Sequence, residues 1–172
     1  EFRRVLFRSL RACGELLPPG ATLSVFDLSP IPLYDEDVRQ QGLPAPVQQL
    51  REQIRAADAL LIATPEYNYS IPGVLKNAID WASREPQQSF KDKPVAIFSA
   101  ATGPLGGARV QYDLRRMLTP LWAMVLPRPE VFIGNAASKF DAHGKLTDET
   151  TAKFLREQMV GFKAWIERVQ PR

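Results

Sequence analysis

Two polar stretches contain residue types that could bind a ligand. The first, residues 64–70, carries two tyrosine rings, an amide, a carboxylate and a hydroxyl. The second, residues 100–107, contains Gly103 and the pair Gly106-Gly107. Glycine lets the backbone approach a flat ligand closely, and several N–H groups could face that ligand. This pattern favours an aromatic heterocycle with carbonyl edges, whereas a triphosphate is disfavoured because no lysine follows the glycines.

Side chains for acid–base or nucleophilic catalysis are sparse. Glu66 is the only carboxylate in its stretch, and one carboxylate does not make an acid–base pair. His143 lies in a turn-like Asp-Ala-His-Gly sequence and is expected to be a solvated loop residue. Cys13 is the only cysteine, so neither a disulfide nor a cysteine-based metal site is possible. We therefore assign no catalytic side chain and no metal ligand, and expect a bound cofactor to carry any redox chemistry.

Each of these features also has a simpler explanation. Gly106-Gly107 could only relax a strand-to-helix turn, and Asn68 could be a turn residue that bonds its own backbone. Ser70 could be a helix N-cap, and Tyr67 and Tyr69 could be packed aromatic residues. The spacing of the residues leaves the ligand-binding and the structural explanations open.

Alternating strands and helices are expected to position these stretches. The hydrophobic pattern predicts strands at 22–28, 59–63, 94–99 and 130–133. It predicts helices from Leu10, from 45 to 57, after Ser70, after Gly107, and from an N-cap at Thr147, with an irregular proline-rich connection at 29–37. Strands separated by helices indicate an α/β fold with a parallel sheet covered on both faces. Residues 64–70 and 100–107 would then lie at its carboxyl edge, where such folds bind ligands.

Composition restricts the class of protein. With 172 residues, 45% of them apolar, the chain suits one domain. A net charge of +3 with scattered basic residues argues against nucleic-acid binding. No apolar run approaches the roughly 20 residues that span a bilayer, which argues against membrane insertion. The lone cysteine favours the cytoplasm.

Two motifs resemble those of a known family. Residues 64–81, TPEYNYSIPGVLKNAIDW, are similar to the signature of the NADPH-dependent FMN reductases, a flavodoxin-like group that includes bacterial quinone and chromate reductases and related azoreductases. Residues 106–115, GGARVQYDLR, are similar to a second motif, in the family's order. The resemblance runs from about Leu10 to the C-terminus.

The resemblance implies FMN at the carboxyl edge of a doubly wound sheet of order 2-1-3-4-5. It implies ping-pong chemistry, in which NADPH or NADH reduces the flavin and leaves, and a quinone or similar acceptor then takes two electrons. The acceptor and the choice between NADPH and NADH stay open. The implied cofactor-binding residues are Pro65, Glu66, Tyr67, Asn68, Ser70, Ala101, Thr102, Gly103 and Gly106.

The resemblance also implies a homodimer or homotetramer with the flavin near the subunit boundary. Arg109, Tyr112 and Glu130 are then interface candidates. Two alternatives are a flavodoxin-type electron carrier, disfavoured because such carriers are usually acidic, and an inactive fragment of a reductase.

The beginning of the chain departs from the family pattern. Ser9-Leu10-Arg11 matches the family's phosphate-binding loop by letters only, because no glycine precedes it and no Ser and Asn follow. We interpret residues 1–9 as a non-native or truncated leader and residues 10–172 as the flavodoxin-like domain, with the first strand missing or replaced. That strand would be central in the sheet, so we expect weaker FMN binding than in intact relatives.

Overall fold

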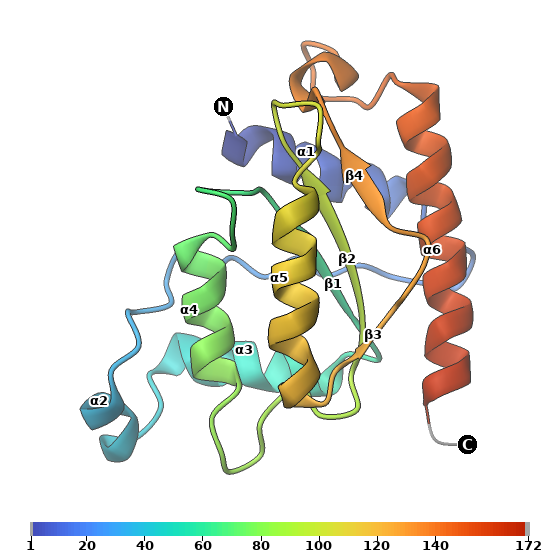
Figure 1. Ribbon diagram of the computed structural model, residues 1–172. Coiled ribbons are helices and arrows are strands. Elements are labelled where there is room, and N and C mark those ends of the chain that lie inside the picture. The colour runs from blue at the N-terminus through green and yellow to red at the C-terminus, as the bar shows by residue number, and fades with distance from the viewer. Residues whose placement is uncertain (1, 171–172) are drawn as a thin grey trace.

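A parallel sheet with helices on both faces makes up the fold. The computed structural model describes the backbone of residues 2–170 and the side chains of residues 7–170. The helices are α1 (Phe2–Glu15), α2 (Glu36–Gln41), α3 (Ala45–Ala56), α4 (Gly73–Ala82), α5 (Ala108–Leu118) and α6 (Glu149–Val169), with short 3-10 turns at Thr119–Leu121 and Ala136–Lys139 (Figure 1). The strands are β1 (Leu60–Thr64), β2 (Pro94–Ala100), β3 (Met124–Val125) and β4 (Val131–Ile133).

All strand pairs are parallel, as predicted. β1 pairs with one edge of β2 from Leu60↔Val95 to Thr64↔Ser99. The other edge of β2 pairs first with β3 and then with β4, from Phe98↔Val131 onward. Among residues 2–170 no strand precedes β1. The structure therefore contains the 3-4-5 part of the expected 2-1-3-4-5 order.

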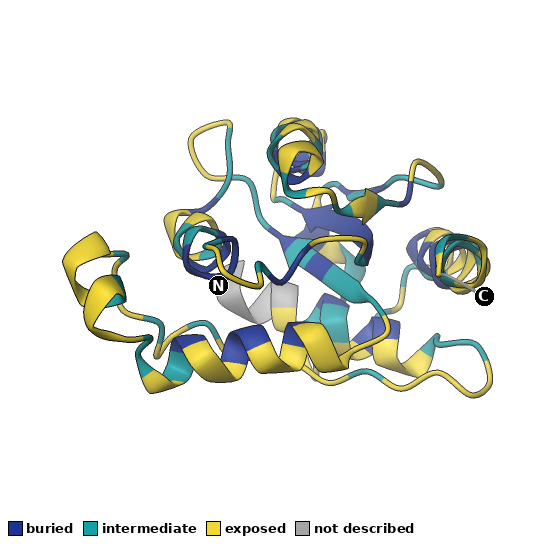
Figure 2. Ribbon diagram, turned by 90° about the horizontal axis from the view of Figure 1, so that it is seen from below, coloured by how far each residue is buried: buried dark blue, intermediate teal, exposed yellow. Residues whose placement is uncertain are grey.

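Apolar side chains cover both faces of the sheet. On one face, Ile62, Val95 and Ile97 pack against residues of α3, α4 and α5. On the opposite face, Phe98 and Ala100 pack against residues of α1 and α6. All seven residues of β2 are buried, which explains why its sequence is a continuous apolar run. Figure 2 shows the helices around the buried strand with their exposed sides outward.

The predicted strand at 22–28 is wrong. This segment runs without regular structure and forms no ladder with another strand in the described chain. Phe26 and Leu28 nevertheless pack against the core that α3, α4 and α5 form with the sheet. The alternating pattern thus correctly indicated a half-buried chain. A strand additionally needs a backbone hydrogen-bonding partner, which the pattern does not specify.

Two segments for which the sequence predicted no helix are helical. α1 begins at Phe2, so residues 2–9 continue the helix predicted from Leu10, because no glycine or proline interrupts them. Ser9-Leu10-Arg11 therefore lies inside a helix and is not a loop. α2 starts at the end of the proline-rich connection because the Asp35 side chain accepts from the backbone N–H groups of Asp37 and Val38.

Helix boundaries differ slightly from prediction. α4 begins at Gly73 after Pro72, so Ser70 is not its N-cap. α6 is capped by Asp148 rather than Thr147, because the Asp148 carboxylate accepts from the N–H of Thr151. Bonds from Thr151 and the ammonium of Lys139 lower the pKa of Asp148 to about 2. The carboxylate therefore stays ionised near the positive end of the helix dipole.

Candidate functional site

Two loops lie side by side at the carboxyl edge of the sheet. Thr64 and Ser99 are paired near the ends of β1 and β2, so residues 65–70 (the β1 loop) and 101–107 (the β2 loop) leave the sheet together. A Cβ atom placed on Gly107 would lie 3.5 Å from the Cβ of Glu66. The predicted juxtaposition is confirmed.

The β1 loop contains a tight turn that presents two aromatic rings. Tyr67 and Ser70 exchange backbone hydrogen bonds of 3.1 and 3.0 Å. Asn68 and Tyr69, between them, have φ values of 47° and 67°. Two successive positive φ values are characteristic of a type I′ turn and suit asparagine at the first position. Tyr67 and Tyr69 are 47% and 69% exposed, so they are not core aromatics, and the Arg109 guanidinium lies over the Tyr69 ring at 4.2 Å from its centroid.

The polar side chains of the β1 loop fasten it to α5. One carboxylate oxygen of Glu66 accepts from the Arg109 guanidinium at 3.1 Å and the other from the Val110 N–H at 3.2 Å. The Ser70 hydroxyl donates to Asp113 at 2.7 Å. The Glu66 carboxylate is favourably placed at the N-terminus of α5. Both side chains, assigned from sequence to the cofactor, hold the loop in place.

The β2 loop is packed onto the end of β4. The Ala101 N–H donates to Ile133 O, and Ala101 O accepts from Ala136 N–H, each at 3.0 Å. A Cβ on Gly106 would come within 2.7–2.9 Å of the backbone from Phe132 to Gly134. A Cβ on Gly134 would come within 2.3 Å of the Pro104 carbonyl oxygen. Gly106 is therefore required for close packing, and Gly134 is a further requirement that the sequence patterns did not single out.

Exposed donors remain on this loop. Thr102, Gly103 and Leu105 are exposed, and their backbone N–H groups donate no hydrogen bond to any described residue. A Cβ on Gly103 would meet nothing within 4 Å, so there is open space beside it. These N–H groups can bind carbonyl oxygens of a ligand. Ala101 can offer only van der Waals contact, since its own N–H and C=O are bonded to the β4 side.

His143 and Cys13 are poorly suited to catalysis. His143 is exposed, and its backbone N–H donates to Asp141 at 2.9 Å. Burial raises the pKa of the Cys13 thiol to about 12, so it stays protonated and unreactive. Within the described residues no group of His, Cys, Asp and Glu side chains could hold a metal ion. Across residues 2–170, no helix has the length and apolar character needed to cross a membrane.

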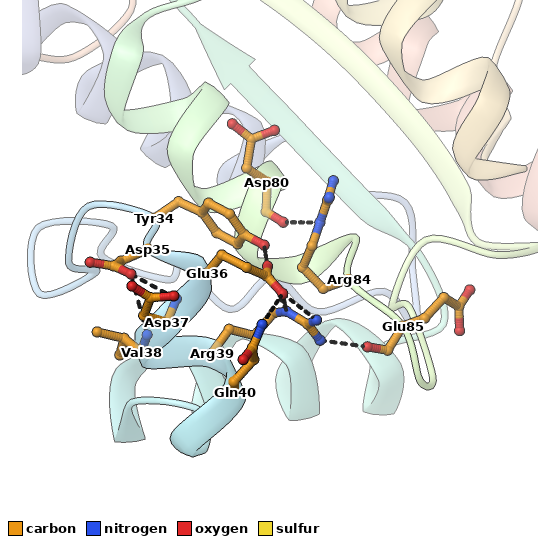
Figure 3. Close-up of polar contacts among 10 residues, drawn as sticks. All are labelled: Tyr34, Asp35, Glu36, Asp37, Val38, Arg39, Gln40, Asp80, Arg84 and Glu85. Atoms are coloured by element: carbon orange, nitrogen blue, oxygen red, sulfur yellow. Dashed lines mark hydrogen bonds and ion pairs between the residues drawn. The ribbon is translucent and has the colours of Figure 1, made fainter.

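A polar hollow lies beside the C-terminal end of α4, where α2 packs (Figure 3). It is lined by Glu36, Arg39, Ser83, Arg84 and Glu85. Arg39 donates to Glu36 at 2.6 Å and to the Glu85 carbonyl at 3.2 Å. Bonds from Arg39 and then from Tyr34 lower the pKa of Glu36 to about 2. Glu36 and Arg39 pair within α2, and the bond from Arg39 to the Glu85 carbonyl joins this helix to the segment that follows α4.

Comparison with known proteins identifies the family. Residues 3–138 match the family described as NADPH-dependent FMN reductase. The chain belongs to this family. It is 52% identical over 155 residues to an NAD(P)H-dependent FMN reductase of Pseudomonas aeruginosa, covering 90% of this chain and 84% of that protein. It is 50% identical over 145 residues to the quinone reductase of Escherichia coli, covering 83% and 77%.

Solved structures agree with this membership. FerB, a flavoenzyme NAD(P)H:(acceptor) oxidoreductase from Paracoccus denitrificans, superposes with a TM-score of 0.87 at 34% identity, covering 95% of this chain and 90% of FerB. The flavodoxin-like fold class is thereby confirmed. An FMN-dependent NADH-azoreductase from Bacillus anthracis, in complex with FMN, has a TM-score of 0.53 at 16% identity and shares the fold alone.

The two loops fit the ring end of FMN. Free N–H groups at Thr102, Gly103 and Leu105 suit the carbonyl edge of a flavin, and the partly exposed ring of Tyr67 suits its flat surface. Ser9-Leu10-Arg11 does not fit the phosphate, because helix formation in α1 directs these backbone N–H groups along the helix.

Proposed function

We propose that this protein is an NAD(P)H-dependent flavoprotein oxidoreductase that reduces a quinone or a similar two-electron acceptor. The observation that carries the proposal is the pair of adjacent loops, one with free backbone donors and one with exposed aromatic rings. The FMN reductase and quinone reductase relatives, each at least half identical over most of this chain, support it.

Bound FMN supplies a ring that accepts a hydride from NAD(P)H and returns two electrons to the acceptor. The N–H groups of Thr102, Gly103 and Leu105 bind and orient its carbonyl edge. Donors at this edge favour negative charge on the reduced ring, so they tune its tendency to accept electrons. The ring is bordered by Pro65 and by the turn that contains Asn68.

Glu66 and Ser70 have an indirect part in this scheme. They fix the β1 loop against α5, which holds in place the turn that carries Tyr67 and Tyr69. Gly106 lets the β2 loop pack closely against the end of β4. This close packing leaves room for a flat ligand on the opposite side of the loop. In this scheme no protein side chain acts as an acid or a base.

We extend the proposal to assembly and location. Arg109 and Tyr112 are exposed on α5 next to the β1 loop, and Tyr112 is 57% exposed. Glu130 is paired with Arg115 at 3.4 Å, near the other end of that helix. Exposed aromatic and charged groups beside the site support a homodimer or homotetramer that contacts this face. The lone buried Cys13 supports a cytoplasmic location, and chromate is a further candidate acceptor.

Steady-state oxidation of NADPH and NADH, with FMN present and with or without benzoquinone, tests the function. We expect quinone-dependent oxidation that follows ping-pong kinetics. A protein that binds FMN but does not oxidise either nucleotide would be an electron carrier. A protein that shows no flavin binding in a fluorescence titration would refute the proposal entirely.

A further inference from the structure

A buried polar pair lies beneath the β2 loop. Ser99 of β2 and Gln111 of α5 are both fully buried. The Gln111 side-chain nitrogen donates to Ser99 Oγ at 2.8 Å and to the Val131 carbonyl at 2.7 Å. The Ser99 hydroxyl then donates to the Gly106 carbonyl at 2.6 Å. A continuous set of hydrogen bonds therefore joins α5, β2 and β4 to the loop.

These bonds fix the orientation of one peptide group. Gly106 and Gly107 have φ values of 60° and 77°, so this part of the backbone is confined to the left-handed region. Because the C=O and N–H of a trans peptide point in opposite directions, holding Gly106 O against Ser99 directs the Gly107 N–H away from Ser99.

The backbone N–H of Gly107 has no hydrogen-bond acceptor among the described residues. Gly107 is buried, and its N–H donates to no described residue. Gly107 ends the β2 loop where it meets the β1 loop, since a Cβ on Gly107 would lie 3.0 Å from the Cβ of Ser99 and 3.5 Å from that of Glu66. A backbone N–H in a buried residue normally has a partner, so this group is suited to a ligand seated between the loops.

We propose that Ser99 and Gln111 are positioning residues for the flavin. They hold the Gly106-Gly107 peptide so that its N–H can donate to the ring, and they thereby raise both the affinity for FMN and its reduction potential. The direction follows because a donor stabilises the more negative, reduced ring more than the oxidised one. This inference rests on the proposed function.

The chain provides a matched control residue. Gln158 of α6 is 1% exposed, and its side-chain nitrogen donates to the Ile97 and Pro129 carbonyls, each at 3.0 Å. Like Gln111, it reaches β2 from a helix, and its buried carbonyl oxygen has no partner. Unlike Gln111, it lies on the α6 face of the sheet, and neither of its bonds reaches the β2 loop. Equivalent substitutions at the two glutamines therefore separate loop positioning from core stability.

The experiment compares Gln111→Met, Gln158→Met and Ser99→Ala in the full chain. Urea unfolding and amide hydrogen exchange of Gly106 and Gly107, the buried residues of the loop, are measured without flavin. FMN affinity and the midpoint potential of bound FMN are then measured by fluorescence and by redox titration. We expect Gln111→Met and Gln158→Met to lower the unfolding midpoint similarly, as each removes two buried hydrogen bonds.

Only the variants at 111 and 99 should affect the loop and the flavin. We expect faster exchange at the buried amides of Gly106 and Gly107, FMN binding weaker by about tenfold, as for the loss of one hydrogen bond, and a more negative midpoint potential. Ser99→Ala keeps the bond from Gln111 to Val131, so it remains informative if Gln111→Met does not fold.

Two results would overturn the inference. One is a Gln158→Met protein whose FMN affinity and potential change as much as those of Gln111→Met, because a purely structural role would then suffice. The other is loop exchange in flavin-free Gln111→Met and Ser99→Ala no faster than in Gln158→Met. This second result needs no flavin, so it is distinct from failure of the proposed function, which would appear as wild-type protein that binds no FMN.

Discussion

Replacing Gly106 by alanine should destabilise the protein through two separable effects. The φ of 60° places alanine in the left-handed region, at a cost of about 1–2 kcal/mol. The new Cβ would also lie 2.7–2.9 Å from three backbone atoms of residues 132–134, and crowding of this kind costs about 1–3 kcal/mol. The two terms predict a loss of about 2–5 kcal/mol in the free energy of unfolding, lessened by any shift of the loop.

Two other glycines serve as controls for this prediction. At Gly20, φ is 83° but nothing lies within 4 Å of a Cβ, so Gly20→Ala should show only the backbone cost of about 1–2 kcal/mol. At Gly103 there is neither a positive φ nor a neighbour within 4 Å, so Gly103→Ala should be close to neutral. Urea unfolding of the three variants gives the ranking Gly106, Gly20, Gly103. A Gly106→Ala protein no less stable than Gly20→Ala would refute the close packing against β4.

Three further predictions concern the caps and the exposed face. Glu66→Gln should change the unfolding free energy by less than about 1 kcal/mol, because glutamine still accepts from Val110 N–H and the lost ion pair with Arg109 is exposed; urea unfolding measures this. Asp148 has a lowered pKa, so its stabilisation of α6 is present above the unfolded carboxyl pKa and is lost as pH falls toward 2. Thermal unfolding should therefore show Asp148→Ala less stable than wild type at pH 7, with the difference shrinking as pH falls toward 2. Tyr112→Glu should reduce the molar mass measured by light scattering if the proposed oligomer uses this face, and an unchanged mass would contradict that interface.

The sequence was most informative where local pattern determines structure. β1 and β2 were predicted because continuous apolar runs suit strands covered on both faces, and the β1 and β2 loops followed from that. The segment 22–28 was misassigned because alternation indicates a half-buried extended chain, whereas strand formation depends on a partner elsewhere in the molecule. The first half of α1 was missed because its bulky residues showed no clear period.

The site residues show the same contrast: those in tight turns were found from the sequence, and those that act through tertiary contacts were not. Tyr67, Asn68 and the glycines were found because tight turns have recognisable compositions. Glu66 was assigned to the cofactor, and its bonds to Arg109 and Val110 emerge only when α5 is placed beside the loop. Ser99 and Gln111 are twelve residues apart and meet only when α5 packs on the sheet. Spacing along the chain contains no sign of that contact.

Residues in the first turns of α5 form hydrogen bonds that hold both loops. Val110 and Asp113 bind the β1 loop, while Gln111, between them, holds the β2 loop through Ser99. A change that rotates or shifts this helix would disturb both loops, while the β2 loop would still be held to the end of β4 by the Ala101 bonds. Natural variation at 70 should therefore be accompanied by variation at 113, and variation at 99 by variation at 111. Redesign for a larger acceptor would best begin at this helix, because neither loop can be altered independently of it.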